Sequence, residues 1–123
     1  MRFHIITIFP EMFDSYLNES ILARAIKNKI IEVKFYNPRD FVKVPKNKTQ
    51  NNYKPVDDKP YGGGPGMVMR AEPILKAVQI ALTAIRRRGG KIKNKKFLII
   101  NFIPTAEKFT TASAKKISKS YSD

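Results

Sequence analysis

Three apolar runs, each followed by a proline, most constrain the fold of this 123-residue chain. They are FHIITIF at residues 3–9, IIEVKFY at 30–36 and FLIINFI at 97–103, and the prolines are Pro10, Pro38 and Pro104. The first and third runs are almost continuously apolar, as in strands buried on both faces of a sheet, and the second alternates after its opening pair. We therefore predict three strands of a parallel α/β sheet.

Helical spacing of apolar residues lies between and after these runs. We expect helices from Pro10 to about residue 17, from an N-cap at Ser20 to about Asn28, over residues 72–88 from Glu72 and Pro73, and over 107–120. Two strands joined by about twenty helical residues predict a parallel βαβ unit with a right-handed crossover. The alternation calls for another strand after the last helix, so we expect the chain to be a piece of a larger domain.

Residues 57–69, DDKPYGGGPGMVM, alternate glycine with proline between a polar and an apolar stretch. Glycine reaches positive φ and lets a ligand or another backbone come close, while proline fixes φ. We predict an ordered, bent loop packed on the sheet, with at least one glycine at positive φ. A purely structural turn before a helix is the plainer interpretation. No Walker A or G-x-G-x-x-G pattern is present, which argues against a P-loop nucleotide site.

The chain is strongly basic, with 24 Lys and Arg residues against 10 acidic residues and a formal net charge of +14. Such a charge attracts polyanions, and nucleic acid is the first candidate. The alternative is compositional bias, because lysine far outnumbers arginine and arginine is the better phosphate and base reader. The lysine-rich stretches at residues 43–59 and 86–96 would be solvated charge by default and phosphate contacts if RNA crosses them.

The chain has no cysteine, and no apolar run approaches the roughly 18 residues of a membrane-spanning helix. We expect a cytoplasmic protein without a signal peptide and with no membrane partner. His4 has no acid or second ligand near it in sequence, so we expect it to be structural.

Four segments together resemble the bacterial tRNA (guanine-N1)-methyltransferase (TrmD) family. They are FPEMF at residues 9–13, NPRDF at 37–41, VDDKPYGGGPGMVM at 56–69 and the predicted strand ending at Pro104. The resemblance implies the SPOUT class, a parallel α/β sheet with a C-terminal trefoil knot, in a homodimer. It also implies methyl transfer from S-adenosylmethionine to N1 of the guanosine 3′ of the anticodon in tRNA, with activity associated with magnesium.

On this resemblance, residues 1–123 are the N-terminal part of one SPOUT domain, and the knot-forming part is absent from the chain. The catalytic base is expected beyond Asp123, and no metal ligand is assigned. Three sets of site residues follow from the motifs: an active-site wall at Asp57, Tyr61, Gly62, Gly63, Gly64, Pro65 and Gly66; a cofactor segment at Asn101, Phe102, Ile103 and Pro104; and RNA contacts at Arg39, Lys54 and Lys59.

The chain departs from the family pattern in the loop before the glycine-rich block, VKVPKNKTQNN, which is several residues longer than usual, and in two motifs. Tyr53 and Pro55 stand where histidine and threonine are usual, and in the first cofactor loop only Pro104 is shared, with Ala106 in place of a glycine. We therefore expect the 123 residues alone to be inactive. The alternative is a non-catalytic, basic RNA-binding remnant of the same enzyme.

Overall fold

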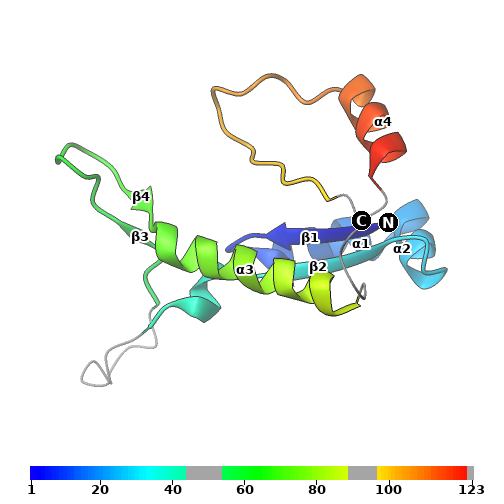
Figure 1. Cartoon of the computed structure of the whole chain (residues 1–123), viewed down its shortest axis with the longest axis horizontal. Helices are drawn as coiled ribbons and strands as arrows, with labels where there is room; N and C mark the ends of the chain where they lie inside the picture. The colour runs from blue at the N-terminus through cyan, green and yellow to red at the C-terminus, as the bar shows by residue number, and fades with distance from the viewer. Residues whose placement is uncertain (44–53, 89–96, 122–123) are drawn as a thin grey trace.

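The computed structural model describes residues 1–43, 54–88 and 97–121. Figure 1 shows the elements in chain order. They are β1 (Arg2–Ile6), η1 (Pro10–Phe13), α1 (Asp14–Leu17), α2 (Ser20–Lys27), β2 (Glu32–Tyr36), η2 (Pro38–Phe41), β3 (Asp57–Asp58), β4 (Val68–Met69), α3 (Ala71–Arg88) and α4 (Thr111–Ser120).

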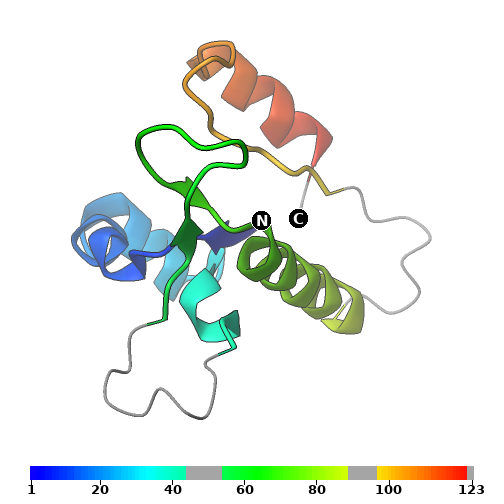
Figure 2. The same ribbon diagram turned by 90° about the vertical axis from the view of Figure 1, so that its left-hand side faces the viewer.

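The predicted parallel pairing of the first two strands is confirmed. β1 and β2 are aligned from Arg2 opposite Glu32 to Ile6 opposite Tyr36. Figure 2 shows η1, α1 and α2 on one side of this pair and α3 on the other. On the first side the rings of Phe13 and Phe35 lie 5.2 Å apart, and on the other side α3 contacts β1. The result is a small three-layer α/β arrangement.

The buried core lies where α3 meets η2 and the segment before β3. Its apolar members are Val56, Ala77 and Ala81, and Pro38 and Pro73 are the largest fully buried side chains. Small residues on α3 let the neighbouring backbone approach closely, so the helix seats both η2 and the start of the glycine-rich segment. This packing positions the candidate site described below.

The helix boundaries differ from expectation in detail. The predicted N-cap role of Ser20 is wrong, because Glu19 is the N-cap residue and Ser20 is the first helical residue, with a positive φ of 54°. The predicted end near Asn28 is confirmed. α3 begins at Ala71, one residue before Glu72, and α4 begins at Thr111 because the Thr110 hydroxyl caps it by accepting from the Ser113 amide at 3.2 Å.

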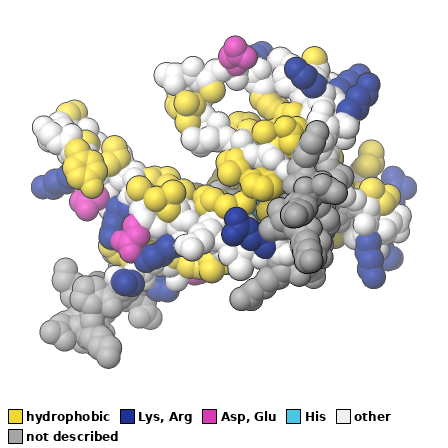
Figure 3. Space-filling view, viewed as in Figure 1, with side chains coloured by type: hydrophobic (Ala, Val, Ile, Leu, Met, Phe, Trp, Pro, Cys, Tyr) yellow, Lys and Arg dark blue, Asp and Glu magenta, His cyan; other side chains and the backbone are white. Residues whose placement is uncertain are grey.

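The predicted strand at residues 97–103 is wrong for this structure. The segment has no assigned strand, and every residue in it is exposed. Figure 3 shows apolar side chains gathered along it at the surface. Strand composition sets only a tendency, and a strand forms where a neighbouring strand pairs with it. The sheet that contains β1 and β2 has two strands among the described residues, rather than the three expected.

Candidate functional site

The glycine-rich segment forms a hairpin that projects from the body of the molecule (Figure 1). β3 and β4 pair antiparallel, with Asp57 opposite Met69 and Asp58 opposite Val68. The expected packing of the loop on the sheet is wrong: residues 61–69 are all exposed, and Tyr61 is fully so. The base of the loop is attached to the rest of the molecule, and its tip is exposed to solvent.

The prediction of positive φ at a glycine is confirmed at all four positions. Gly62, Gly63, Gly64 and Gly66 have φ of 87°, 82°, 109° and 92°. A Cβ built at any of them would meet no atom within 4 Å, so the glycines are needed for backbone conformation rather than to make room for a neighbour. One hydrogen bond, from the Gly63 amide to the Pro60 carbonyl at 3.1 Å, tightens the turn. The tip therefore presents bare backbone to solvent.

Two arginines hold the base of the hairpin by donating to consecutive carbonyls. The Arg39 guanidinium donates to the Lys54 carbonyl at 3.3 Å, and the Arg70 guanidinium donates to the Pro55 carbonyl at 3.5 Å. The Arg70 amide also donates to the carbonyl of buried Val56 at 2.8 Å. Because Arg39 lies in η2 and Arg70 directly precedes α3, these bonds join the hairpin to both elements.

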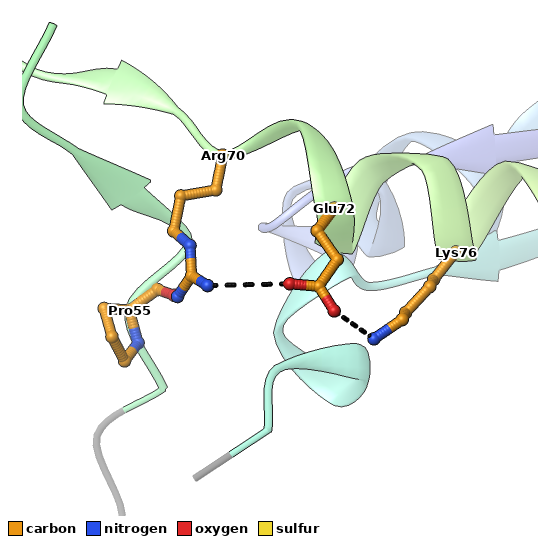
Figure 4. A network of polar contacts seen from close by, with 4 residues as sticks. All are labelled: Pro55, Arg70, Glu72 and Lys76. Carbon is orange, nitrogen blue, oxygen red and sulfur yellow. Dashed lines mark hydrogen bonds and ion pairs between the residues drawn. The ribbon is translucent and has the colours of Figure 1, made fainter. Parts of the chain in front are cut away.

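An ion-pair network extends this base along α3 (Figure 4). Arg70 Nη2 lies 3.7 Å from Glu72 Oε2, and Lys76, one turn further on, binds the other carboxylate oxygen. The pKa of Glu72 lies below its usual range. The largest cause is the hydrogen bond from Lys76, followed by the positive charge of Lys76, and the charges of Arg70 and Lys43 lower the pKa further. Sequence reasoning missed Arg70. A signal was present only for its partner Glu72, which precedes Lys76 by four residues in the first turn of a helix, where a carboxylate is favourable.

The predicted RNA-contact residues lie around the hairpin, although not as one cluster of free cations. Arg39 is half-buried and bonded to Lys54, and its own amide donates to the Asn37 side chain at 3.0 Å. Lys59 is exposed beyond Asp58, whose carboxylate accepts from the Lys59 amide at 2.8 Å. Much of the two lysine-rich stretches, including Lys46, Lys48, Lys91, Lys93, Lys95 and Lys96, lies outside the described residues.

The predicted cofactor segment does not form a cradle with the described part of the chain. Asn101, Phe102, Ile103 and Pro104 are all exposed, and the segment turns at Ala106, whose amide donates to the Ile103 carbonyl at 3.2 Å. Figure 1 shows this segment well separated from the hairpin tip. Among the residues that the structure describes, none encloses this segment, so no chemical step follows from these four residues alone.

His4, which we expect to be structural, contacts Tyr36 on the neighbouring strand. Its Nδ1 lies 2.9 Å from the Tyr36 hydroxyl, and the two rings stack at 5.6 Å across β1 and β2. Within the ranges that the structure describes, no group of three or more His, Cys, Asp or Glu side chains is arranged to hold a metal ion.

Comparison with known proteins identifies the family. Residues 1–122 match the family profile described as tRNA (Guanine-1)-methyltransferase TrmD. The chain belongs to this family. A TrmD relative from Buchnera aphidicola subsp. Acyrthosiphon pisum, named tRNA (guanine-N(1)-)-methyltransferase, is 56% identical over 79 residues, which are 64% of this chain and 30% of the relative.

Two further similarities extend the match. A tRNA (guanine-N(1)-)-methyltransferase from Pseudoalteromonas atlantica is 35% identical over 120 residues, which are 98% of this chain and 40% of that protein. The crystal structure of tRNA (m1G37) methyltransferase from Aquifex aeolicus superposes with a TM-score of 0.56 at 38% identity, covering 68% of this chain and 34% of that one.

The chain thus spans about a third of the length of its TrmD relatives and corresponds to their N-terminal part. Its mixed α/β fold with a parallel strand pair matches the N-terminal region of the solved structure. Among the described helices, none combines the length and the apolar character that crossing a bilayer requires.

Proposed function

We propose that this chain is the N-terminal part of a methyltransferase that uses S-adenosylmethionine to methylate N1 of the guanosine 3′ of the anticodon in tRNA. The observation that carries the proposal is the family match over residues 1–122, which includes the glycine-rich hairpin. The proposal includes the SPOUT knot and the homodimer in the complete enzyme, its cytoplasmic location, and magnesium-associated activity.

The hairpin suits the role of an active-site wall. Its four left-handed glycines expose backbone amides without side chains in front of them, and a second surface can approach them closely. The anchored base keeps this tip in a fixed direction relative to α3 through the Arg70 and Arg39 hydrogen bonds. We assign Asp57, Tyr61, Gly62, Gly63, Gly64, Pro65 and Gly66 to this wall.

The remaining assignments follow the family motifs. Asn101, Phe102, Ile103 and Pro104 contact the adenosine part of the cofactor once other walls enclose it. Lys59 is the exposed cation of the RNA-contact set, while Arg39 and Lys54 contribute charge beside it. Methyl transfer needs a donor carbon held in line with N1, and misplacement by about an ångström is costly. The open cofactor segment therefore supports the proposal that the chain alone is inactive.

A second candidate is a non-catalytic RNA-binding remnant. The net charge of +14 and the exposed cofactor segment favour it. Such a protein would bind tRNA through backbone electrostatics, with no cofactor requirement.

The two candidates are separated by measuring N1-methylguanosine in tRNA from bacteria depleted of their own enzyme. The cells express either this chain alone or a chimera in which its residues 1–121 precede the rest of the Buchnera (Acyrthosiphon pisum) relative. The proposed function predicts that the chimera restores the modified base and that the chain alone does not. A soluble chimera that restores none, beside an active full-length relative, would support the remnant.

A further inference from the structure

One face of α4 carries cations and no acidic side chain. Lys115, Lys116 and Lys119 are all exposed, and the helix sequence TASAKKISKS contains no Asp or Glu. At 3.6 residues per turn, these three positions lie within about a third of the helix circumference. Figure 3 shows Lys and Arg side chains gathered over α4, at the upper right. We call these three residues the α4 lysine face.

The α4 lysine face lies opposite the packed side of the helix. That packed side carries Ile117 and Tyr121, which are half-buried and help to line a shallow hollow of about 350 Å³. Lys116 borders this hollow, whereas Lys115 and Lys119 are not among the residues that line it. Two of the three ammonium groups are therefore directed to solvent and open to a ligand.

The charges of this face are not neutralised within the chain that the structure describes. There, no carboxylate lies close enough to these lysines to form an ion pair, whereas Lys76 of α3 is bound to Glu72. Lys115 and Lys119 are four residues apart, and like charges at this spacing destabilise a helix. An anion bound between them would relieve this repulsion.

The chemistry of the face favours phosphates of a nucleic acid over a lipid surface. A helix that binds an anionic membrane also presents large apolar side chains to it. The large apolar side chains of this region, Ile117 and Tyr121, are on the packed side of α4 instead. Lysine binds phosphate as a point charge, and phosphate contacts fix the position of a nucleic acid without reading its sequence.

We propose that the α4 lysine face binds backbone phosphates of a tRNA stem, as a second contact region apart from the hairpin. This inference rests on the proposed function, which supplies tRNA as the polyanion. Figure 1 shows α4 well away from the hairpin tip, so the two regions touch different parts of one tRNA. The net charge of +14 attracts tRNA to the chain, and the α4 lysine face helps to orient it.

The test measures binding of the 123-residue chain to an unmodified tRNA transcript at several salt concentrations, without S-adenosylmethionine. The test variant combines Lys115→Gln with Lys119→Gln, because glutamine removes the charge and keeps a similar helix propensity. Each duplex phosphate contact contributes roughly 0.9 to the log–log salt slope, which is about 8-fold in affinity at about 0.1 M salt relative to about 1 M. The variant should therefore reduce the slope by roughly 1.8 and weaken binding at about 0.1 M salt by roughly 10- to 60-fold.

Matched variants separate the α4 lysine face from net charge. Lys29→Gln with Lys34→Gln removes two charges outside α4, so it should leave the slope unchanged and weaken binding by less than about threefold. Lys115→Arg with Lys119→Arg keeps both charges and should bind tRNA as the unsubstituted chain does. Equal weakening by the two glutamine variants, an unchanged slope in the α4 glutamine variant, or weakened binding by the arginine variant overturns the proposal.

Two further measurements distinguish the other outcomes. Vesicles of phosphatidylcholine and phosphatidylserine test a lipid ligand. If the α4 glutamine variant loses vesicle binding but keeps tRNA affinity, the face belongs to a lipid surface and the proposal is overturned. Methyl transfer by the chimera described above tests the proposed function separately. An inactive chimera beside a reduced salt slope in the α4 glutamine variant contradicts the proposed function and supports the α4 contact.

Discussion

Gly64 offers the sharpest test of why the hairpin tip is rich in glycine. Its φ of 109° is a positive value that L residues rarely adopt, and an added Cβ would meet nothing within 4 Å. A Gly64→Ala substitution therefore isolates backbone strain from steric crowding. We expect the variant to fold, with a hairpin that opens more often.

The magnitude follows from two opposed terms. A non-glycine residue in such a sparsely populated region costs about 1–3 kcal/mol. Alanine also restricts the unfolded chain, which offsets about 0.4–1 kcal/mol of that cost. The net destabilisation of the tip is about 1–2 kcal/mol, which corresponds to a roughly 5- to 30-fold larger open population.

Amide hydrogen exchange measures this opening locally. The Gly63 amide, which donates to the Pro60 carbonyl, should exchange faster by that factor in the variant. The Thr7 amide, which donates to the Tyr36 carbonyl between β1 and β2, should be unchanged. Met67→Ala is the control, because it alters an exposed side chain of the same loop at a position without positive φ. Unchanged or slower exchange at Gly63 in Gly64→Ala would refute the claim that the glycines maintain left-handed backbone.

Four other outcomes follow from the structure. Lys29 has a φ of 57° just after α2, where its amide donates to the Ile26 carbonyl and the Ile30 amide donates to the Ala25 carbonyl. Because glycine adopts a positive φ without strain, Lys29→Gly should raise the free energy of unfolding, measured by urea titration, by about 1 kcal/mol. Lys29→Ala is the control and should not raise it. Val56→Ala should cost about 2 kcal/mol, more than Val68→Ala, since Val56 is 3% exposed and Val68 is 44% exposed. Because the pKa of Glu72 is lowered in the folded chain, its ion pairs stabilise the fold at pH values above the usual carboxyl range, and this stabilisation is lost as pH falls through the lowered pKa. Glu72→Gln should therefore make the free energy of unfolding fall less steeply as the pH is lowered. Binding of tRNA to the chain should weaken steeply with salt, with a log–log slope of roughly 0.9 per duplex phosphate contacted, and a nearly salt-independent affinity would contradict the electrostatic interpretation.

The first half of the fold was predictable because its signals are local. Residues 3–9 and 30–36 carry strand patterns, the segment between them forms the short helices η1, α1 and α2, and a βαβ unit pairs such strands in parallel. Positive φ in the glycine-rich segment was also predictable, because glycine is the residue that adopts positive φ without strain and three of them, Gly62, Gly63 and Gly64, are consecutive.

The rest depends on contacts that sequence patterns do not contain. Residues 97–103 have strand composition, but a strand requires a partner, and the segment has none among the described residues. The outward projection of the hairpin follows from Arg39 and Arg70 donating to carbonyls at its base, contacts between residues about fifteen apart in sequence. The roles assigned to the tip and to Asn101, Phe102, Ile103 and Pro104 stay predictions.

The central claim is that this chain supplies the N-terminal part of a tRNA methyltransferase and needs the remainder for chemistry. The most direct measurement is transfer of labelled methyl groups from S-adenosylmethionine to purified tRNA, comparing the 123-residue chain with the chimera described above. The account predicts transfer by the chimera to tRNA with guanosine 3′ of the anticodon, loss of transfer when adenosine replaces that guanosine, and no transfer by the chain alone. Methylation by the purified chain alone would contradict it.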